Sequence, residues 1–179
     1  MKRTVLTILS AFIICCSFAQ GTTATTTITT ADKVYKHSGE VLDVKVIKVS
    51  EFTVSYKYPG EDAEQVISKL AVSKIKYSSG RTEEISDKIV VSGKDDWEKV
   101  QIISDKVQVV GLKKGEEVRG KTSGMLSYNT AGSADKKASK KIKEAAAEMG
   151  APFVLLTSDK NDGFGIKQAV KNGVAYSYK

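Results

Sequence analysis

Residues 133–158, SADKKASKKIKEAAAEMGAPFVLLTS, predict a helix that is followed by a buried strand. Apolar residues recur at spacings of three and four in the first part of this stretch, so they share one face of an α-helix. These residues are Ala134, Ala138, Ile142, Ala145, Ala146 and Met149. Ser133 can cap the first turn through its hydroxyl group, and Asp135 suits the positive end of the helix dipole. Because alanine dominates the apolar face, we expect the helix to lie close to a sheet.

The residues after the helix predict where it ends. Gly150 lies at the position that commonly adopts a left-handed conformation, and Pro152 cannot continue a helix. The run from Phe153 to Leu156 is continuously apolar, which is typical of a strand covered on both faces. The chain is therefore expected to be organised around one helix and the strand that follows it.

Residues 1–19 predict a cleaved signal peptide. Lys2 and Arg3 precede an apolar segment, residues 5–16, that is too short to span a bilayer comfortably. Small residues at positions 17 and 19 match the positions that a signal peptidase recognises. We expect cleavage after Ala19, which gives an exported protein (periplasmic, outer-envelope or extracellular) without a transmembrane span.

Both cysteines of the chain, Cys15 and Cys16, lie inside this leader. Lipid attachment at one of them is an alternative, although the residues before each cysteine lack the Leu-x-small pattern. A cleaved chain has no cysteine, which excludes disulfides, thiolate catalysis and cysteine metal sites. Loss of Lys2 and Arg3 leaves 26 basic and 21 acidic residues, so the net charge falls from +7 to +5. This moderate excess is only weak evidence for any polyanion partner, and no nucleic-acid partner is expected.

Residues 20–31 form a threonine-rich spacer that includes GTTATTTITT. Its apolar surface is too small to support a packed core. An O-glycosylated stalk is the alternative interpretation of this composition.

Residues 32–91 predict an all-β module. Apolar and polar residues alternate through residues 52–58, and the same alternation in residues 42–49 slips at Ile47, as a β-bulge requires. Turns are expected at residues 59–60 and 78–80. Short strands with tight turns favour a small β-barrel or a curled sheet.

The segment GEVLDVKVIKVSEFTVSYKY, residues 39–58, resembles the opening strands of SH3-like and Sm-like barrels. The resemblance implies a small β-barrel shape. RNA binding, which the Sm-like family implies, does not suit an exported chain, so we carry over the shape alone.

Residues 92–179 predict an α+β module with the order ββ-α-ββ and one main helix on one face of a sheet. Strands are expected over residues 97–103 and 107–112, and a hairpin over residues 113–124, where glycines punctuate a polar stretch. Alternation from Val174 to Tyr178 predicts a last strand inside the sheet.

Three segments of this module, VVGLKKGEEVRGKTSG, KKIKEAAAEMGAPFVLLTS and GVAYSY, resemble small bacterial envelope proteins. These proteins are the outer-membrane Rcs stress-sensor lipoproteins and the YbjQ-like domains. The resemblance implies an exported envelope protein with an α+β domain. The Rcs-type sensors carry disulfide cysteines, which the mature chain lacks, so their sensing role is not carried over.

The sequence contains no motif that predicts catalysis, a cofactor or a metal site. His37 is the only histidine, and we expect it at the surface beside a strand. Residues 159–163 resemble a calcium loop, but Gly163 is at its fifth position and Val170 at its twelfth, so a tight polar turn is expected. Trp97 and the tyrosines are expected in the core, with a sugar-binding platform as the alternative.

The candidate binding residues are five lysines on the outer side of the predicted helix: Lys136, Lys137, Lys140, Lys141 and Lys143. A solvated helix face is the simplest interpretation. The alternative is contact with an anionic envelope component (lipid phosphate or acidic polysaccharide) or with an acidic envelope protein.

Two classes of function remain open. The first is a non-enzymatic envelope or extracellular protein that acts by binding or structural contact, and we expect this one. The second is a hydrolase of an envelope or extracellular polymer. Such an enzyme would use paired carboxylates across a cleft, drawn from Asp95, Asp96, Glu116 and Glu117.

Overall fold

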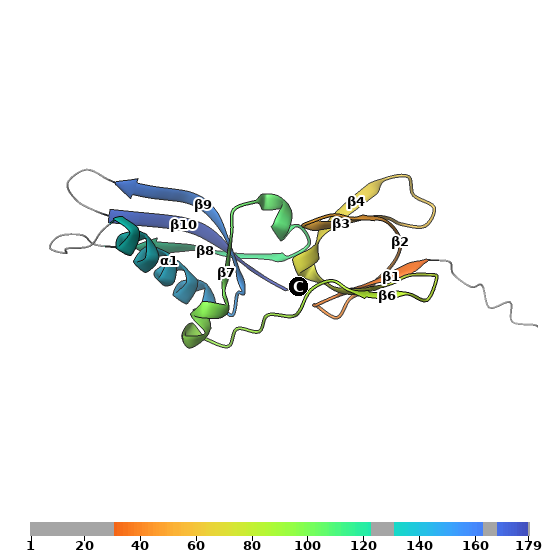
Figure 1. The fold of residues 1–179 in the computed structure, drawn as a ribbon, viewed down its shortest axis with the longest axis horizontal. Coiled ribbons are helices and arrows are strands. Elements are labelled where there is room, and N and C mark those ends of the chain that lie inside the picture. The colour runs from red at the N-terminus through yellow and green to blue at the C-terminus, as the bar shows by residue number, and fades with distance from the viewer. Residues whose placement is uncertain (1–30, 123–130, 163–167, 179) are drawn as a thin grey trace, which may run out of the picture.

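The computed structural model describes residues 31–122, 131–162 and 168–178 (Figure 1). It contains two β-sheets and one long helix, so the fold is α+β. The two sheets lie at opposite ends of an elongated molecule, and the helix covers the second sheet (Figure 1). The expected leader and nearly all of the expected spacer lie outside the described residues. Within those residues, no helix is both long enough and apolar enough to cross a membrane.

The first sheet has six antiparallel strands in the spatial order β4-β3-β2-β1-β5-β6. They are β1 (Asp32–Lys36), β2 (Val41–Val49), β3 (Thr53–Lys57), β4 (Glu64–Ser68), β5 (Val72–Lys76) and β6 (Thr82–Glu84). In the described chain β4 and β6 each pair with one strand only, so the predicted barrel does not close. The physical reason is that β6 has three residues, after which the chain leaves the sheet toward the second module.

Local features of this sheet follow the sequence closely. The register between β2 and β3 shifts between Val46 and Lys48, which confirms the bulge predicted at Ile47. Gly60 and Gly80 have φ angles of 83° and 88°, as the two predicted turns require. Alternation and turn chemistry therefore predicted the strands correctly, although they did not determine whether the sheet closes.

The second sheet has the spatial order β7-β9-β10-β8. Its strands are β7 (Gln101–Ile103), β8 (Lys113–Lys121), β9 (Phe153–Asp162) and β10 (Gln168–Ser177). β7 runs parallel to β9, and β10 pairs antiparallel with both β9 and β8. With helix α1 (Ala131–Glu148) between β8 and β9 in the chain, the element order is the predicted ββ-α-ββ.

Helix α1 lies very close to the second sheet. A Cβ atom at Gly120 of β8 would be 2.2 Å from the carbonyl oxygen of Ala138, and one at Gly173 of β10 would be 3.3 Å from the Ile142 side chain. Ala138 and Ile142 are completely buried on the face of α1 that packs against the sheet. The helix ends as predicted, because Gly150 has a φ angle of 65°. It begins at Ala131, before the expected cap at Ser133.

Residues 94–121 differ most from the prediction. The expected strands over residues 97–103 and 107–112 are largely short 3₁₀ helices, η2 (Lys94–Lys99) and η3 (Lys106–Val109). Another short helix, η1 (Lys69–Ala71), lies beside the first sheet. Where a hairpin was expected in residues 113–124, residues 113–121 form the single strand β8, and residues 123–124 lie outside the described residues. This strand lies at the sheet edge and buries only Val118 and Gly120, so it needs no regular apolar alternation.

β9 contributes to two of the three hydrophobic clusters in the described residues. Phe153 and Leu155 pack with residues of the first sheet, whereas Val154 packs beneath α1. This confirms that the apolar run after Pro152 is a strand covered on both faces. The strand continues to Asp162, so the tight turn expected from Asp159 is wrong for the described residues. Gly163 lies outside them.

The contact between the two modules contains His37, which was expected at the surface but is 8% exposed. Its ring lies 5.0 Å from that of Tyr178, measured between centroids. The Ser86 hydroxyl donates to the carbonyl oxygen of Val72 at 2.8 Å, so its oxygen accepts a hydrogen bond from the His37 Nε2–H at 2.9 Å. Lys88 donates to the His37 carbonyl oxygen at 3.0 Å. The imidazole is therefore part of the junction.

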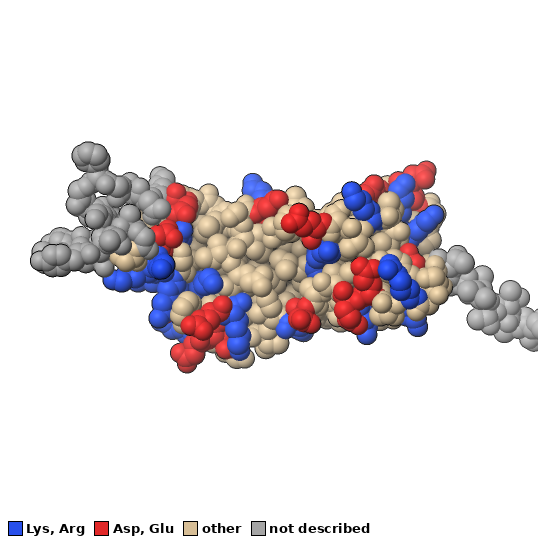
Figure 2. Space-filling model, in the orientation of Figure 1, with Lys and Arg blue, Asp and Glu red and all other residues tan. Residues whose placement is uncertain are grey.

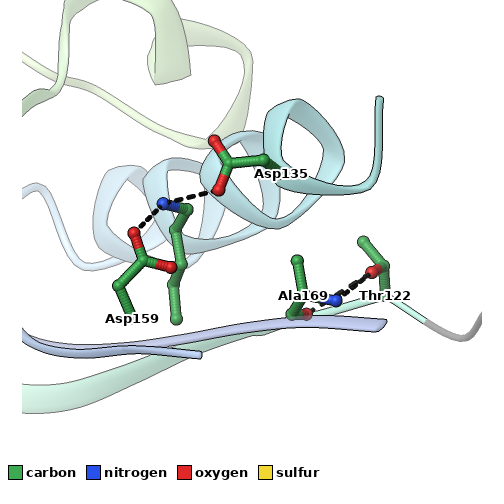
Figure 3. Close-up of polar contacts among 5 residues, drawn as sticks. Thr122, Asp135, Asp159 and Ala169 are labelled. Atoms are coloured by element: carbon green, nitrogen blue, oxygen red, sulfur yellow. Dashed lines mark hydrogen bonds and ion pairs between the residues drawn. The ribbon is translucent and has the colours of Figure 1, made fainter. Parts of the chain in front are cut away.

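The N-terminal half of α1 is attached to the sheet by a buried lysine (Figure 3). The Lys171 ammonium group lies 2.8 Å from a carboxylate oxygen of Asp135 on α1 and 2.6 Å from one of Asp159 on β9. Only 7% of the Lys171 side chain is exposed. Burial alone would lower the pKa of Lys171, but its hydrogen bonds to Asp135 and Asp159 outweigh burial and raise the pKa. Lys171 thus stays charged and holds α1 in place.

We predict that Lys171→Met lowers the free energy of unfolding by about 1–3 kcal/mol, because two neighbouring carboxylates lose their shared cation. Urea denaturation followed by far-ultraviolet circular dichroism measures this change. Lys45→Met, at an exposed position of β2, is the matched control and should change stability by less than about 0.5 kcal/mol. Equal effects of the two substitutions would contradict the assigned role of Lys171.

We also predict that acid weakens the junction through His37. Burial lowers the pKa of His37 below its ordinary value of 6.5, and the nearby Lys88 ammonium lowers it further. As the pH falls, the His37 imidazole is therefore protonated in the unfolded chain before it is protonated in the folded chain. Stability is full above pH 6.5 and declines as the pH falls toward the folded-state pKa.

Urea denaturation between about pH 7.5 and about pH 5 tests this prediction. One proton limits the slope to about 1.4 kcal/mol per pH unit. His37→Gln, which does not titrate, should remove this part of the pH dependence. An unchanged slope in that variant would show that other groups cause it.

Candidate functional site

Four of the five candidate lysines line one groove on the surface of α1. The groove has a volume of about 420 Å³, and its lining consists of Trp97, Lys136, Lys137, Ser139, Lys140 and Lys143. Lys136, Lys140 and Lys143 follow a spacing of four and three, so they share one face of the helix. The helical rise places them in a row about 10 Å long. Helical periodicity thus brings these cations together.

Lys141 lies outside the groove. Its ammonium group donates a hydrogen bond to the carbonyl oxygen of Lys121 on β8, at a distance of 2.8 Å. The position after Lys140 is turned by about 100° around the helix axis, which explains the separation. The stripe predicted from the sequence therefore divides into a groove-lining set and one lysine over the sheet edge.

Trp97 lines the groove beside the lysines, a position that sequence reasoning did not predict. It belongs to η2, which packs against α1, and its indole ring contacts the core beneath the helix. The Lys140 ammonium group lies over the indole ring, 4.8 Å from the ring centroid. The prediction of a core tryptophan is only half correct, because the ring is partly exposed and lines the groove. No local pattern predicts this position, since η2 and α1 are far apart in the sequence.

The lining combines an apolar floor with a charged rim. The indole ring and the lysine methylene groups supply apolar surface, while the ammonium groups extend to solvent. Lys136 and Lys143 form no ion pair with the described part of the chain. Lys140 lies 3.8 Å from Glu144, and this exposed pair contributes little to stability. Positive charge is therefore available to a ligand.

Acidic residues surround the groove on the η2 side. Figure 2 shows Lys and Arg gathered over α1, with Asp and Glu close by at the same end of the molecule. Lys94 pairs with Glu148 at 3.4 Å, and Lys99 pairs with Asp96 at 2.7 Å. The Lys99 ammonium and the Ser92 amide both lower the pKa of Asp96. The positive charge at the groove therefore comes from α1.

A second cavity, of about 500 Å³, involves β8, β9 and β10. It is lined by Glu117, Val118, Arg119, Thr157, Asn172 and Gly173. Lys171 contacts α1, so the next residue, Asn172, lies on the sheet face opposite the helix. Among the four carboxylates considered for hydrolysis, only Glu117 lines either cavity. Asp95 and Asp96 belong to η2, on the helix side, so the paired-carboxylate cleft of the hydrolase alternative is not assembled from these residues.

The described residues include no cluster of three or more His, Cys, Asp or Glu side chains suited to a metal ion. His37, the only histidine, is engaged in the junction between the modules and lines neither cavity.

Neither a protein-family model nor a curated protein sequence matches this chain. The resemblances to SH3-like or Sm-like barrels and to the Rcs and YbjQ-like proteins remain predictions from the sequence.

Proposed function

We propose that this protein is an exported, non-enzymatic envelope or extracellular protein that binds an anionic ligand through the groove on α1. The observation that carries the proposal is that four lysines of α1 and Trp97 of η2 line the same groove, with the Lys140 ammonium over the indole ring. A solvated helix face requires no such arrangement, because lysines on it need only water. Here the cations share the rim of an open, largely apolar groove.

Electrostatics supports a negatively charged ligand. Lys136 and Lys143 lie on one helix face and are not neutralised by carboxylates of the described chain. Each exposed cation that meets an anion contributes between about 0.2 and 1 kcal/mol, so several contacts are needed for useful affinity. An extended or multivalent anion obtains these contacts together.

We predict that dextran sulfate, used as a generic polyanion probe, binds the protein and changes the fluorescence of Trp97. Trp97 is the only tryptophan of the chain, so the signal reports on the groove. Affinity should fall with added salt, because exposed charges are screened over about 10 Å at 0.1 M salt. The double substitution Lys136→Gln/Lys143→Gln should weaken binding about tenfold.

The matched control is Lys121→Gln/Lys141→Gln, which removes the same charge outside the groove. It should weaken binding by less than about threefold, an effect of overall charge alone. Equal losses in both double variants, or no binding of the polyanion at low salt, would contradict the proposed function.

A further inference from the structure

We propose that the ligand of the α1 groove is an acidic polysaccharide, whose sugar rings rest on Trp97 and the lysine methylene groups while its carboxylates meet the lysine ammonium groups. This inference rests on the proposed function and specifies its ligand class. It combines two interpretations that the sequence kept apart: the lysine stripe and an aromatic sugar platform.

The apolar floor requires a ligand that carries apolar surface next to its negative charge. Trp97 is partly exposed beside Lys136, Lys140 and Lys143. A bare phosphate or sulfate pairs with the ammonium groups but offers no apolar surface to the indole ring. A uronate sugar has a carboxylate attached directly to a ring with an apolar C–H face. Contact between that face and the indole ring buries apolar surface, which is favourable.

Lys140 connects the two parts of this recognition. Its ammonium group lies over the indole ring at 4.8 Å, and about half of its side chain is exposed. An exposed cation–π contact contributes only about 0.5–1 kcal/mol, so the side chain can follow a carboxylate that enters the groove. Movement of this ammonium group uncovers the indole face for a sugar ring.

The length of the lysine row favours a chain of sugars. Lys136 and Lys143 lie about 10 Å apart along the helix axis, which is longer than one hexose ring. A single acidic sugar therefore reaches only part of the row. A polymer with an acid group on each ring can engage several lysines together, which increases its affinity through effective concentration.

The acidic residues of η2 argue against a lipid surface. Asp95, Asp96 and Glu98 would approach any anionic surface that covered the groove broadly. A narrow polymer avoids them.

The experiment compares three anionic probes with the full protein by isothermal titration calorimetry at fixed salt. The probes are polygalacturonate, poly-L-glutamate and phosphatidylglycerol vesicles. Polygalacturonate should bind at least about tenfold more tightly than poly-L-glutamate, a difference that one aromatic contact can supply. Methyl-esterified polygalacturonate, which retains the sugar rings without their charge, should bind far more weakly.

Trp97 provides two tests of the ring contact. In the wild-type protein, bound polygalacturonate should protect Trp97 from quenching by acrylamide, whereas bound poly-L-glutamate should not. Trp97→Leu, checked for folding by circular dichroism, should lose the preference for polygalacturonate and retain its affinity for poly-L-glutamate. The quenching measurement does not depend on whether this variant folds.

The outcomes separate the two proposals. Equal affinity for polygalacturonate and poly-L-glutamate, or tightest binding to vesicles, would overturn the polysaccharide inference and leave anion binding intact. A preference that survives Trp97→Leu would also overturn it. Failure of every anionic probe to bind would overturn the proposed function itself.

Discussion

The close approach of α1 to the second sheet is the constraint on which the rest of this module depends. Gly120 permits it, because any side chain there would collide with the backbone of Ala138. Lys171 maintains it through two carboxylates, one on the helix and one on β9. Because the alanine face of α1 packs against the sheet, the helix presents its lysines outward. The position of the groove therefore follows from how the helix packs.

The same packing explains why a binding surface forms beside η2. The short helix covers the C-terminal part of α1 and brings Trp97 alongside the lysine row. The indole ring packs against the core beneath the helix, and the lysines lie beside it on the surface of α1. An apolar floor with charges above it suits a ligand that has both apolar faces and acid groups.

Sequence reasoning predicted the elements more completely than their assembly. The helix end at Gly150, the bulge at Ile47 and the buried strand that begins at Phe153 were all correct, because each depends on local chemistry or periodicity. The edge strand β8 was mistaken for a hairpin, since only Val118 and Gly120 among its residues are buried. His37 was placed at the surface because its burial arises from the junction between the modules.

The sequence by itself determined that one face of α1 carries lysines and the opposite face carries alanine, because helical periodicity assigns every residue to a face. It also determined where the helix ends and where the buried strand begins. Only the tertiary structure decided that the first sheet stays open, that Lys141 is separated from the other lysines, and that Trp97 lies among them. These features depend on which surfaces pack against each other, and that packing is determined by residues that are distant in the sequence.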